Sequence, residues 1–253
     1  MPIDRNILLD SLNDLLKPEE FDDYCPNGLQ VEGTNQISTV VCGVTASQWL
    51  IDRAVALNAD AILVHHGFFW KGENQRVIGM KYRRLQGLIK NNINLIAYHL
   101  PLDAHPEYGN NVQLATLLGV EVTGSLNPGD PRSVGNVGRL RQPKTAKDFC
   151  AHVSGILGRE PLLISGGDHL IDTIGWCTGS AHGYIEQASN LGLDAYLSGE
   201  ISEPTVHSAR ELGVHYIAAG HHATERYGVR SLGEYLANKF GITCTFVDEE
   251  NPV

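Results

Sequence analysis

Apolar and polar residues alternate along the chain in short blocks that predict strands and helices in turn. Residues 37–44 (ISTVVCGV) form an apolar run typical of a strand, and residues 48–58 follow with apolar side chains at helical spacing. Further strands are predicted at 61–64, 93–98, 173–177, 195–197, 214–219 and 242–247. Further helices are predicted at 1–16, 81–90, 110–118, 146–157 and 201–212, and in a long segment that ends near Phe240. This alternation is typical of α/β proteins, in which helices flank a sheet.

The pattern changes between about Glu121 and Lys147, where Gly, Pro, Ser, Asn and basic residues dominate. Such a composition is typical of a long connection or of a boundary between domains. We therefore expect two α/β lobes with mixed sheets flanked by helices, residues 1–125 and residues 126–253, with the cut somewhere within 121–140.

The composition excludes several classes of protein. Of 253 residues, 42% are hydrophobic and 19% are charged, which excludes an intrinsically disordered chain. The formal net charge of −10 argues against general affinity for nucleic acid. No segment approaches the roughly 18–20 apolar residues of a membrane span. Asp4, Asp10 and Asp14 interrupt the first apolar residues, so we expect no secretory signal there.

The five cysteines are scattered and include no CxxC pair. This distribution is typical of a reduced, cytoplasmic chain rather than of a disulfide scaffold or a thiolate zinc site. Any metal ion would therefore be bound by imidazole and carboxylate groups.

Histidines and carboxylates follow three of the predicted strands, those at 61–64, 93–98 and 214–219. The carboxyl ends of strands in open α/β sheets line the crevice in which ligands bind. Imidazole nitrogen and carboxylate oxygen are common metal ligands, and a carboxylate can bridge two ions. The side chains in question are His65, His66, His99, Asp103, His221, His222 and Glu225.

The spacing of these groups limits how they can share a site. His221 and Glu225 are four residues apart at the start of a helix, so both can lie on one face. His65 and His66 are adjacent, and a regular strand would direct them to opposite faces. Both reach one site only if Gly67 turns the chain at once or if they bind two different ions, which favours a dinuclear centre. The alternative is that adjacent pairs arise by chance among 11 histidines and are hydrogen-bonded strand ends.

Several strings of residues together resemble one known family. They are DYCPNGLQVEG (23–33), GVTAS (43–47), VHHGFFWKG (64–72), HLPLDAH (99–105) and AGHHATE (219–225). In them the chain resembles the Nif-three-like family, whose members are often labelled GTP cyclohydrolase I type 2 homologues, and within it the YbgI-like bacterial branch. The resemblance runs from about Asp22 to Val253.

The resemblance implies a two-domain α/β subunit that assembles into a toroidal homohexamer, with a dinuclear metal centre between the lobes of each subunit. It implies two divalent ions per subunit, and imidazole with carboxylate suits Zn, Fe, Mn, Co or Ni equally. The first lobe would contribute three ligands and the second lobe two. Carried over residue by residue, the implied ligands are His65, His66 and Asp103, then His221 and Glu225.

Two further histidines, His99 and His222, are candidates for supporting the ligands or for transferring protons. For His99 the alternative is a capped strand end. Substrate-binding residues cannot be named with the same support. Two segments could contact a ligand, the polar turn with Tyr24, Asn27 and Gln30 and the aromatic run Phe68, Phe69 and Trp70, but a plain turn and core packing explain them as well.

Two functions from different classes fit these observations. The first is a metal-dependent, cyclohydrolase-like hydrolase that acts on a nucleotide-like small molecule through a metal-bound water. The second is a non-catalytic metal-binding or regulatory hexameric ring. Access to the ions distinguishes them, because an open site favours chemistry and a sealed site favours a structural role.

Overall fold

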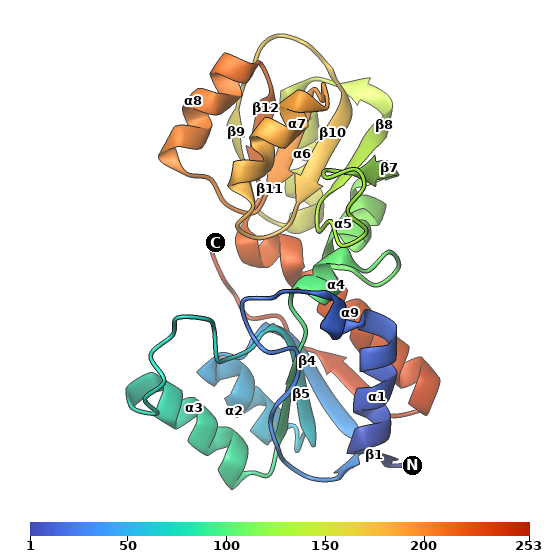
Figure 1. The fold of residues 1–253 in the computed structure, drawn as a ribbon, viewed down its shortest axis with the longest axis vertical. Helices are drawn as coiled ribbons and strands as arrows, with labels where there is room; N and C mark the ends of the chain where they lie inside the picture. The colour runs from blue at the N-terminus through green and yellow to red at the C-terminus, as the bar shows by residue number, and fades with distance from the viewer. The chain divides into compact units, whose positions relative to one another are not determined.

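The chain folds into two α/β units (Figure 1), and the computed structural model describes residues 1–253. Unit 1 contains Met1–Tyr108 and Gly228–Glu250, whereas unit 2 contains Gly109–Tyr227 and Asn251–Val253. Helix α9 (His221–Phe240) begins in unit 2 and ends in unit 1.

Unit 1 is built on a five-stranded sheet with the order β13-β4-β5-β6-β2. Its strands are β2 (Gly28–Val31), β4 (Thr39–Thr45), β5 (Ala61–His66), β6 (Asn94–Ala97) and β13 (Thr243–Phe246), with β1 (Ile3–Asp4) and β3 (Gln36–Ile37) as a separate pair. Its helices are α1 (Arg5–Leu16), α2 (Gln48–Ala56), α3 (Gly79–Lys90) and α4 (Leu100–Ala104), with a 3-10 turn at Pro18–Glu20. Strands β13, β4, β5 and β6 run parallel, and β2 is antiparallel to β6.

Both faces of this sheet are covered, as its sequence pattern requires. Successive strand residues point to opposite faces, so Leu63 packs against α1 and α9 while Ile62 and Val64 pack against α2 and α3. Figure 1 shows α2 and α3 on one side of β4 and β5 and α1 on the other. Parallel strands buried on both faces are expected to be continuously apolar, as β5 is over residues 61–64.

Unit 2 has the same layered plan around a six-stranded sheet with the order β7-β8-β10-β11-β12-β9. Its strands are β7 (Val120–Ser125), β8 (Asn136–Lys144), β9 (Leu162–Ile164), β10 (Ile171–Cys177), β11 (Ala195–Ser198) and β12 (His215–Ala218). Its helices are α5 (Asn110–Leu118), α6 (Ala146–Leu157), α7 (Ile185–Asn190) and α8 (Glu203–Leu212), with a 3-10 turn at His182–Tyr184. The central strands β10, β11 and β12 run parallel; β8 is antiparallel to β10, β9 to β12 and β7 to β8.

Local sequence signals fix where several helices begin. Ser47 accepts a hydrogen bond from the Leu50 N–H at the start of α2, and Thr145 does the same for Asp148 at the start of α6. Such side chains satisfy N–H groups that have no partner within the helix. At the C-terminal end of α5, Gly119 adopts the left-handed conformation (φ 66°) that the sequence predicts for a C-terminal cap.

The predicted mixed α/β fold with helix-flanked sheets is confirmed, but one segment of it was predicted wrongly. Residues 121–147 were expected to be a connection, whereas they contain most of β7 and all of β8. Strand β8 pairs with both β7 and β10, and β7 lies at the edge of the sheet. The expected cut within 121–140 differs from the observed division, because the chain enters unit 2 at Gly109 and returns to unit 1 at Gly228.

Candidate metal-binding groups

The carboxyl ends of two neighbouring parallel strands of unit 1, β5 and β6, deliver its candidate side chains. Strand β5 ends at His66, which lies opposite Thr45 at the end of β4. Strand β6 ends at Ala97 and is followed by Tyr98 and His99. Parallel neighbouring strands end at the same edge of a sheet, so the topology brings these residues together.

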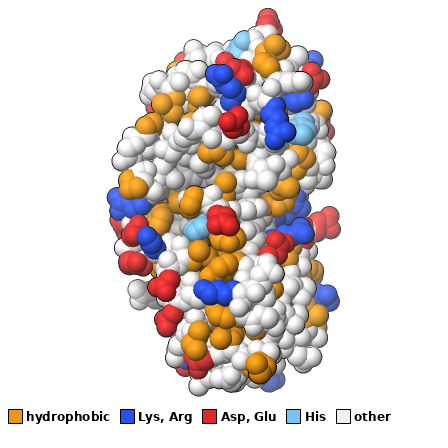
Figure 2. Space-filling model, turned by 90° about the vertical axis from the view of Figure 1, so that its right-hand side faces the viewer, with side chains coloured by type: hydrophobic (Ala, Val, Ile, Leu, Met, Phe, Trp, Pro, Cys, Tyr) orange, Lys and Arg blue, Asp and Glu red, His pale blue; other side chains and the backbone are white.

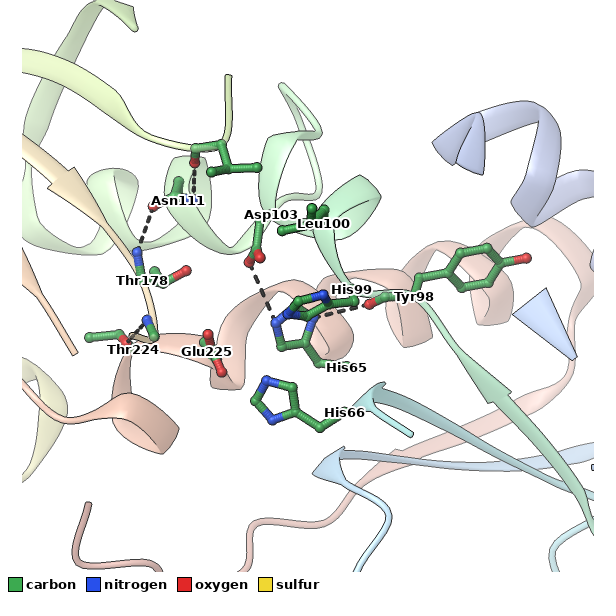
Figure 3. Close-up of polar contacts among 12 residues, drawn as sticks. His65, His66, Tyr98, His99, Leu100, Asp103, Asn111, Thr178, Thr224 and Glu225 are labelled. Atoms are coloured by element: carbon green, nitrogen blue, oxygen red, sulfur yellow. Dashed lines mark hydrogen bonds and ion pairs between the residues drawn. The ribbon is translucent and has the colours of Figure 1, made fainter. Parts of the chain in front are cut away.

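His65 is fully buried, with a hydrogen bond at one ring nitrogen and a carboxylate near the other. Its Nδ1 donates to the Tyr98 carbonyl (3.0 Å), and its Nε2 lies 3.6 Å from Oδ1 of Asp103. Figure 3 shows both contacts. Asp103 comes from α4, which starts directly after His99 with Pro101 in its first turn, a position that proline favours. The predicted ligands His65 and Asp103 are therefore adjacent within unit 1.

His66 lies beside His65, with the ring centroids 4.5 Å apart. Thr45 Oγ1 is 3.2 Å from its Nδ1. The alternation of a regular strand does not separate the two rings because β5 ends here and Gly67 follows. A Cβ at Gly67 would collide with the side-chain amide of Gln30, so this close approach requires glycine.

His99 is anchored by a carboxylate that the sequence reasoning did not single out. Its Nδ1 donates to Asp23 Oδ1 (2.6 Å), and its backbone N–H donates to Asn27 Oδ1 (2.7 Å). Asp23 also accepts from the Leu100 N–H (2.9 Å), at the start of α4. Burial would raise the pKa of Asp23, but hydrogen bonds from His99 and Asn27, with the charge of His99, lower it below its ordinary value. The polar turn therefore orients His99.

Three imidazoles thus cluster within unit 1. His65, His66 and His99 each place one ring nitrogen within 4.8 Å of the others, a grouping that could hold a metal ion. Trp70 lies against the cluster, with its ring centroid 5.0 Å from that of His99 and edge-on to it. Cys25 is also near His99, but burial and the charge of Asp23 raise its pKa to about 12, so it is a neutral thiol.

The candidate side chains of unit 2 lie at the start of α9. His221 Nε2 is 3.1 Å from Glu225 Oε2, as the four-residue spacing predicted, and its Nδ1 donates to Glu200 Oε1 (2.6 Å). Glu200 follows β11 and also accepts from the Ser180 hydroxyl (2.9 Å). Burial lowers the pKa of His221, but Glu225 and Glu200 outweigh it and raise the pKa to about 9.

A glycine also makes room for the groups of unit 2. Gly179 has φ of +68°, and a Cβ there would meet Oε1 of Glu225 and approach Nε2 of His221. His222, the second predicted supporting group, follows His221 in the helix and is therefore directed elsewhere around its axis. It is 8% exposed, and its backbone N–H donates to the Val253 carbonyl (3.0 Å).

The aromatic run next to His66 divides between core and surface. Phe68 is buried in the core between the sheet, α2 and α3, whereas Phe69 is 38% exposed and adopts φ of 65°.

No helix of the chain combines the length and the apolar composition needed to cross a membrane. Figure 2 shows one face, on which acidic and basic side chains are interspersed rather than gathered by sign.

The chain is similar in sequence and in structure to several known proteins. The family model described as Duf34/NIF3 (NGG1p interacting factor 3) matches residues 3–252. A Pseudomonas aeruginosa protein named GTP cyclohydrolase 1 type 2 homolog is 58% identical over 252 residues, which is 100% of both chains. A solved structure titled protein ybgI, of unknown function, has a TM-score of 0.95 and 46% identity, covering 99% of this chain and 100% of its own. A structure from Thermus thermophilus has a TM-score of 0.89 and 33% identity, covering 99% and 100%.

Proposed function

Because the chain belongs to the Duf34/NIF3 family, we propose that it is a cytoplasmic protein that binds two divalent metal ions and uses them to hydrolyse a nucleotide-like substrate. The nucleotide class rests on the name of the relatives, GTP cyclohydrolase 1 type 2 homolog. In this proposal the chain acts as a homohexamer. The proposed ligands are His65, His66, Asp103, His221 and Glu225.

One observation carries the metal-binding part of the proposal. The Nδ1 atoms of His65, His66 and His221 are each engaged by an oxygen, from a backbone carbonyl, a threonine hydroxyl and the Glu200 carboxylate. Histidines that bind metals almost always have the nitrogen opposite the ion held in this way, which fixes the orientation of the ring. The remaining Nε2 atoms of His65 and His221 lie near carboxylates, so nitrogen and oxygen donors occur together.

The carboxylates support a cation for a second reason. Asp103 is 7% exposed and Glu225 is 3% exposed. A buried carboxylate is costly unless positive charge or hydrogen bonds compensate it. Protonated His221 supplies that charge beside Glu225 when no ion is bound, and a divalent ion would take its place there and add positive charge beside Asp103. Zn, Fe, Mn, Co and Ni all suit this donor set.

In this proposal some residues bind the metal ions and others orient the ligands. His65, His66 and Asp103 would bind from unit 1, and His221 and Glu225 from unit 2, while Glu200 would orient His221. A bound divalent ion supplies Lewis acidity and activates water at neutral pH. His99 and His222 are the groups proposed to support the ligands or to move protons.

Turnover of nucleotides by metal-loaded protein tests the catalytic part. Metal-free protein is reconstituted with Zn²⁺, Mn²⁺ or Co²⁺ and incubated with GTP and a panel of other nucleotides, and products are identified by mass spectrometry. We expect product from the loaded protein and none from His65→Ala. His207→Ala, which removes an exposed histidine of α8, should behave as the unsubstituted protein. Absence of product with every metal, or equal product from His65→Ala, contradicts the hydrolase proposal.

The burial of the proposed ligands favours a second candidate function. His65, Asp103 and Glu225 are all less than 9% exposed, which also suits a metal-binding or regulatory ring without catalysis. Native mass spectrometry of His65→Ala and Glu225→Gln separates the two functions. Loss of the ions together with loss of assembly supports the structural role, whereas loss of ions from an intact assembly removes it.

A further inference from the structure

Strand β13 forms one edge of the sheet of unit 1 and pairs on one side only, with β4. The Thr243 N–H donates to the Ser38 carbonyl (2.8 Å), so the backbone groups of residues 243 and 245 face β4. Alternate residues of a strand direct these groups to opposite sides. The N–H and C=O groups of Cys244 and Phe246 therefore point outward from the edge of the sheet.

This edge lacks the features that usually prevent a further strand from pairing. Natural sheets protect their edges with charged residues, proline, bulges or very short strands. Strand β13 has the sequence TCTF, without charge or proline, and its register with β4 is unbroken. Strands β2 and β7, at other sheet edges, are each interrupted by a register shift, and β9 has three residues. Among the edge strands, β13 is thus the least protected.

A groove of about 450 Å³ lies beside this edge, between β13 and α9. Its walls are β13, Cys42 of β4, and Arg230, Gly233 and Glu234 of α9. Gly233 lets the helix approach the sheet, because a Cβ there would lie 2.7 Å from the Cys42 sulfur. Cys244 and Phe246 pack on this face of the sheet and are only partly buried. A strand added at the edge would direct alternate side chains toward the groove.

The edge and the groove are complementary to themselves, which favours a second copy of the chain as the added strand. A two-fold axis at Thr245 places Cys244 of one copy opposite Phe246 of the other, and each such pair exchanges two backbone hydrogen bonds. Arg230 and Glu234 are 59% and 66% exposed and lie four residues apart on α9. Two antiparallel copies of α9 would bring Arg230 of one opposite Glu234 of the other. An interface with two-fold symmetry requires such self-complementarity.

We propose that β13 is a self-association surface, through which two copies of the chain pair antiparallel and join their five-stranded sheets into one sheet of ten strands. The two Thr245 residues face each other at the axis. Phe246 of each copy packs beside Cys244 of the other, in the groove under α9. This inference uses none of the proposed metal ligands. It goes beyond the proposed homohexamer by assigning a contact, and it also holds for a dimer.

Cysteines introduced on β13 test the register of this pairing. Facing residues between the hydrogen-bonded positions of an antiparallel pair have Cα atoms about 4.5 Å apart, a distance that a disulfide can span. Thr245→Cys should therefore cross-link two chains under mild oxidation, and mass spectrometry of the peptides should locate the bond between the two introduced cysteines. Both this variant and its control carry Cys244→Ala, which removes the neighbouring thiol.

Thr243→Cys is the matched control for the cross-link. Thr243 is also exposed and lies on the same face of β13 as Thr245. In the proposed register its two copies would be separated by four residue positions, or roughly 13 Å. We therefore expect no disulfide between chains from Thr243→Cys.

Reversal of charge on α9 tests the contact between the helices. Arg230→Glu would place like charges opposite each other and should weaken self-association by more than about tenfold, measured by analytical ultracentrifugation over a dilution series. Arg230→Glu/Glu234→Arg restores opposite charges across the axis and should restore the affinity. Arg210→Glu, which reverses an exposed charge on α8, should leave the affinity unchanged.

The outcomes distinguish this inference from the proposed function. A cross-link at position 245 but not at 243, with recovery in the double charge variant, supports it. Equal cross-linking at both positions, a hexamer without a cross-link at 245, or a cross-link from 245 to a different protein overturns it and leaves the metal-binding proposal intact. A dimer that binds ions but forms no hexamer overturns only the homohexamer. A chain that is monomeric at every concentration overturns both the pairing and the homohexamer.

Discussion

The two units present imidazoles at the ends of parallel strands, but they hold them with different chemistry. In unit 1, the Nδ1 atoms of His65 and His66 contact uncharged oxygens, a backbone carbonyl and a threonine hydroxyl, and one carboxylate, that of Asp103, lies 3.6 Å from His65 Nε2. In unit 2, His221 lies between the carboxylates of Glu200 and Glu225. The neutral contacts at Nδ1 orient the rings of unit 1, whereas the two carboxylates of unit 2 contact both ring nitrogens of His221 and stabilise a positive charge on it.

This difference predicts different behaviour when no ion is bound. Because the pKa of His221 is raised to about 9, a proton compensates the carboxylates of unit 2 at neutral pH. An ion that uses His221 must displace that proton. The groups of unit 2 are therefore stable as an ion pair, while the Nδ1 atoms of His65 and His66 in unit 1 contact neutral groups.

The largest expected effect comes from removing a proposed ligand of unit 1. His65→Ala should lower the affinity for Co²⁺ by more than about 100-fold, since orienting partners alone contribute about 10–100-fold. Isothermal titration of the metal-free protein measures the change, with His207→Ala as the matched control. An unchanged affinity would remove unit 1 from the metal-binding account.

Removing the groups that contact Nδ1 of His66 and of His221 tests the difference between the units. Glu200→Gln, which retains the size of the side chain, should weaken Co²⁺ binding by about 10–100-fold. Thr45→Val, which removes the hydroxyl beside His66, should have less than about a tenfold effect because a charged hydrogen bond is roughly twice as strong as a neutral one. Equal effects of the two substitutions would contradict this difference between the units.

Each unit also has a glycine packed against a polar side chain, Gln30 for Gly67 and Glu225 for Gly179, and the two should respond differently to alanine. Gly67→Ala should cost about 1–3 kcal/mol of unfolding free energy through overpacking against Gln30. Gln30→Ala in the same chain should recover most of that loss. Gly179→Ala adds strain at positive φ, so truncating a neighbour cannot fully relieve it. Urea denaturation measures all three, and a failure of Gln30→Ala to rescue would show that the Gly67 contact is misassigned.

The smallest effect concerns the stability of the metal-free protein as a function of pH. The pKa of His221 in the folded chain, about 9, lies above its ordinary value of 6.5. Its contribution to stability is therefore complete below pH 6.5 and disappears as the pH rises through 9.

In the presence of a chelator, His221→Gln should therefore lower the free energy of unfolding by about 1 kcal/mol at pH 6 and by much less at pH 10. The difference in unfolding free energy between the two proteins, measured across this range, checks the sign. A cost that grows with pH would contradict the ion pair.

The order of elements could be predicted from sequence where periodicity and burial agree. Helices at Asn110–Leu118 and Ala146–Leu157 have the predicted bounds. Strand β8 was missed because it lies near the sheet edge, with most of its residues partly or fully exposed, and so lacks an apolar run. The return of β13 to pair with β4 depends on a contact across some 200 residues, which no local pattern encodes.

Most of the candidate side chains could be predicted from their positions after predicted strands. The same reasoning could also have identified one residue that the sequence analysis did not name. The rule that ligands follow parallel strands identifies His65, His66 and His221. Applied to the predicted strand at 195–197, it would also have found Glu200, which follows β11. Asp23 carries no such signal, because it lies in a turn and reaches His99 only through the fold.

The number of divalent ions per chain tests the central claim most directly. Protein purified without chelator, or reconstituted from the metal-free form, is analysed by elemental mass spectrometry against quantitative amino-acid analysis. The account predicts two ions per chain, and a loss of ions in His65→Ala/His66→Ala that His207→Ala does not show. Protein that retains no divalent ion under either condition, or a double variant that retains its full complement, would contradict it.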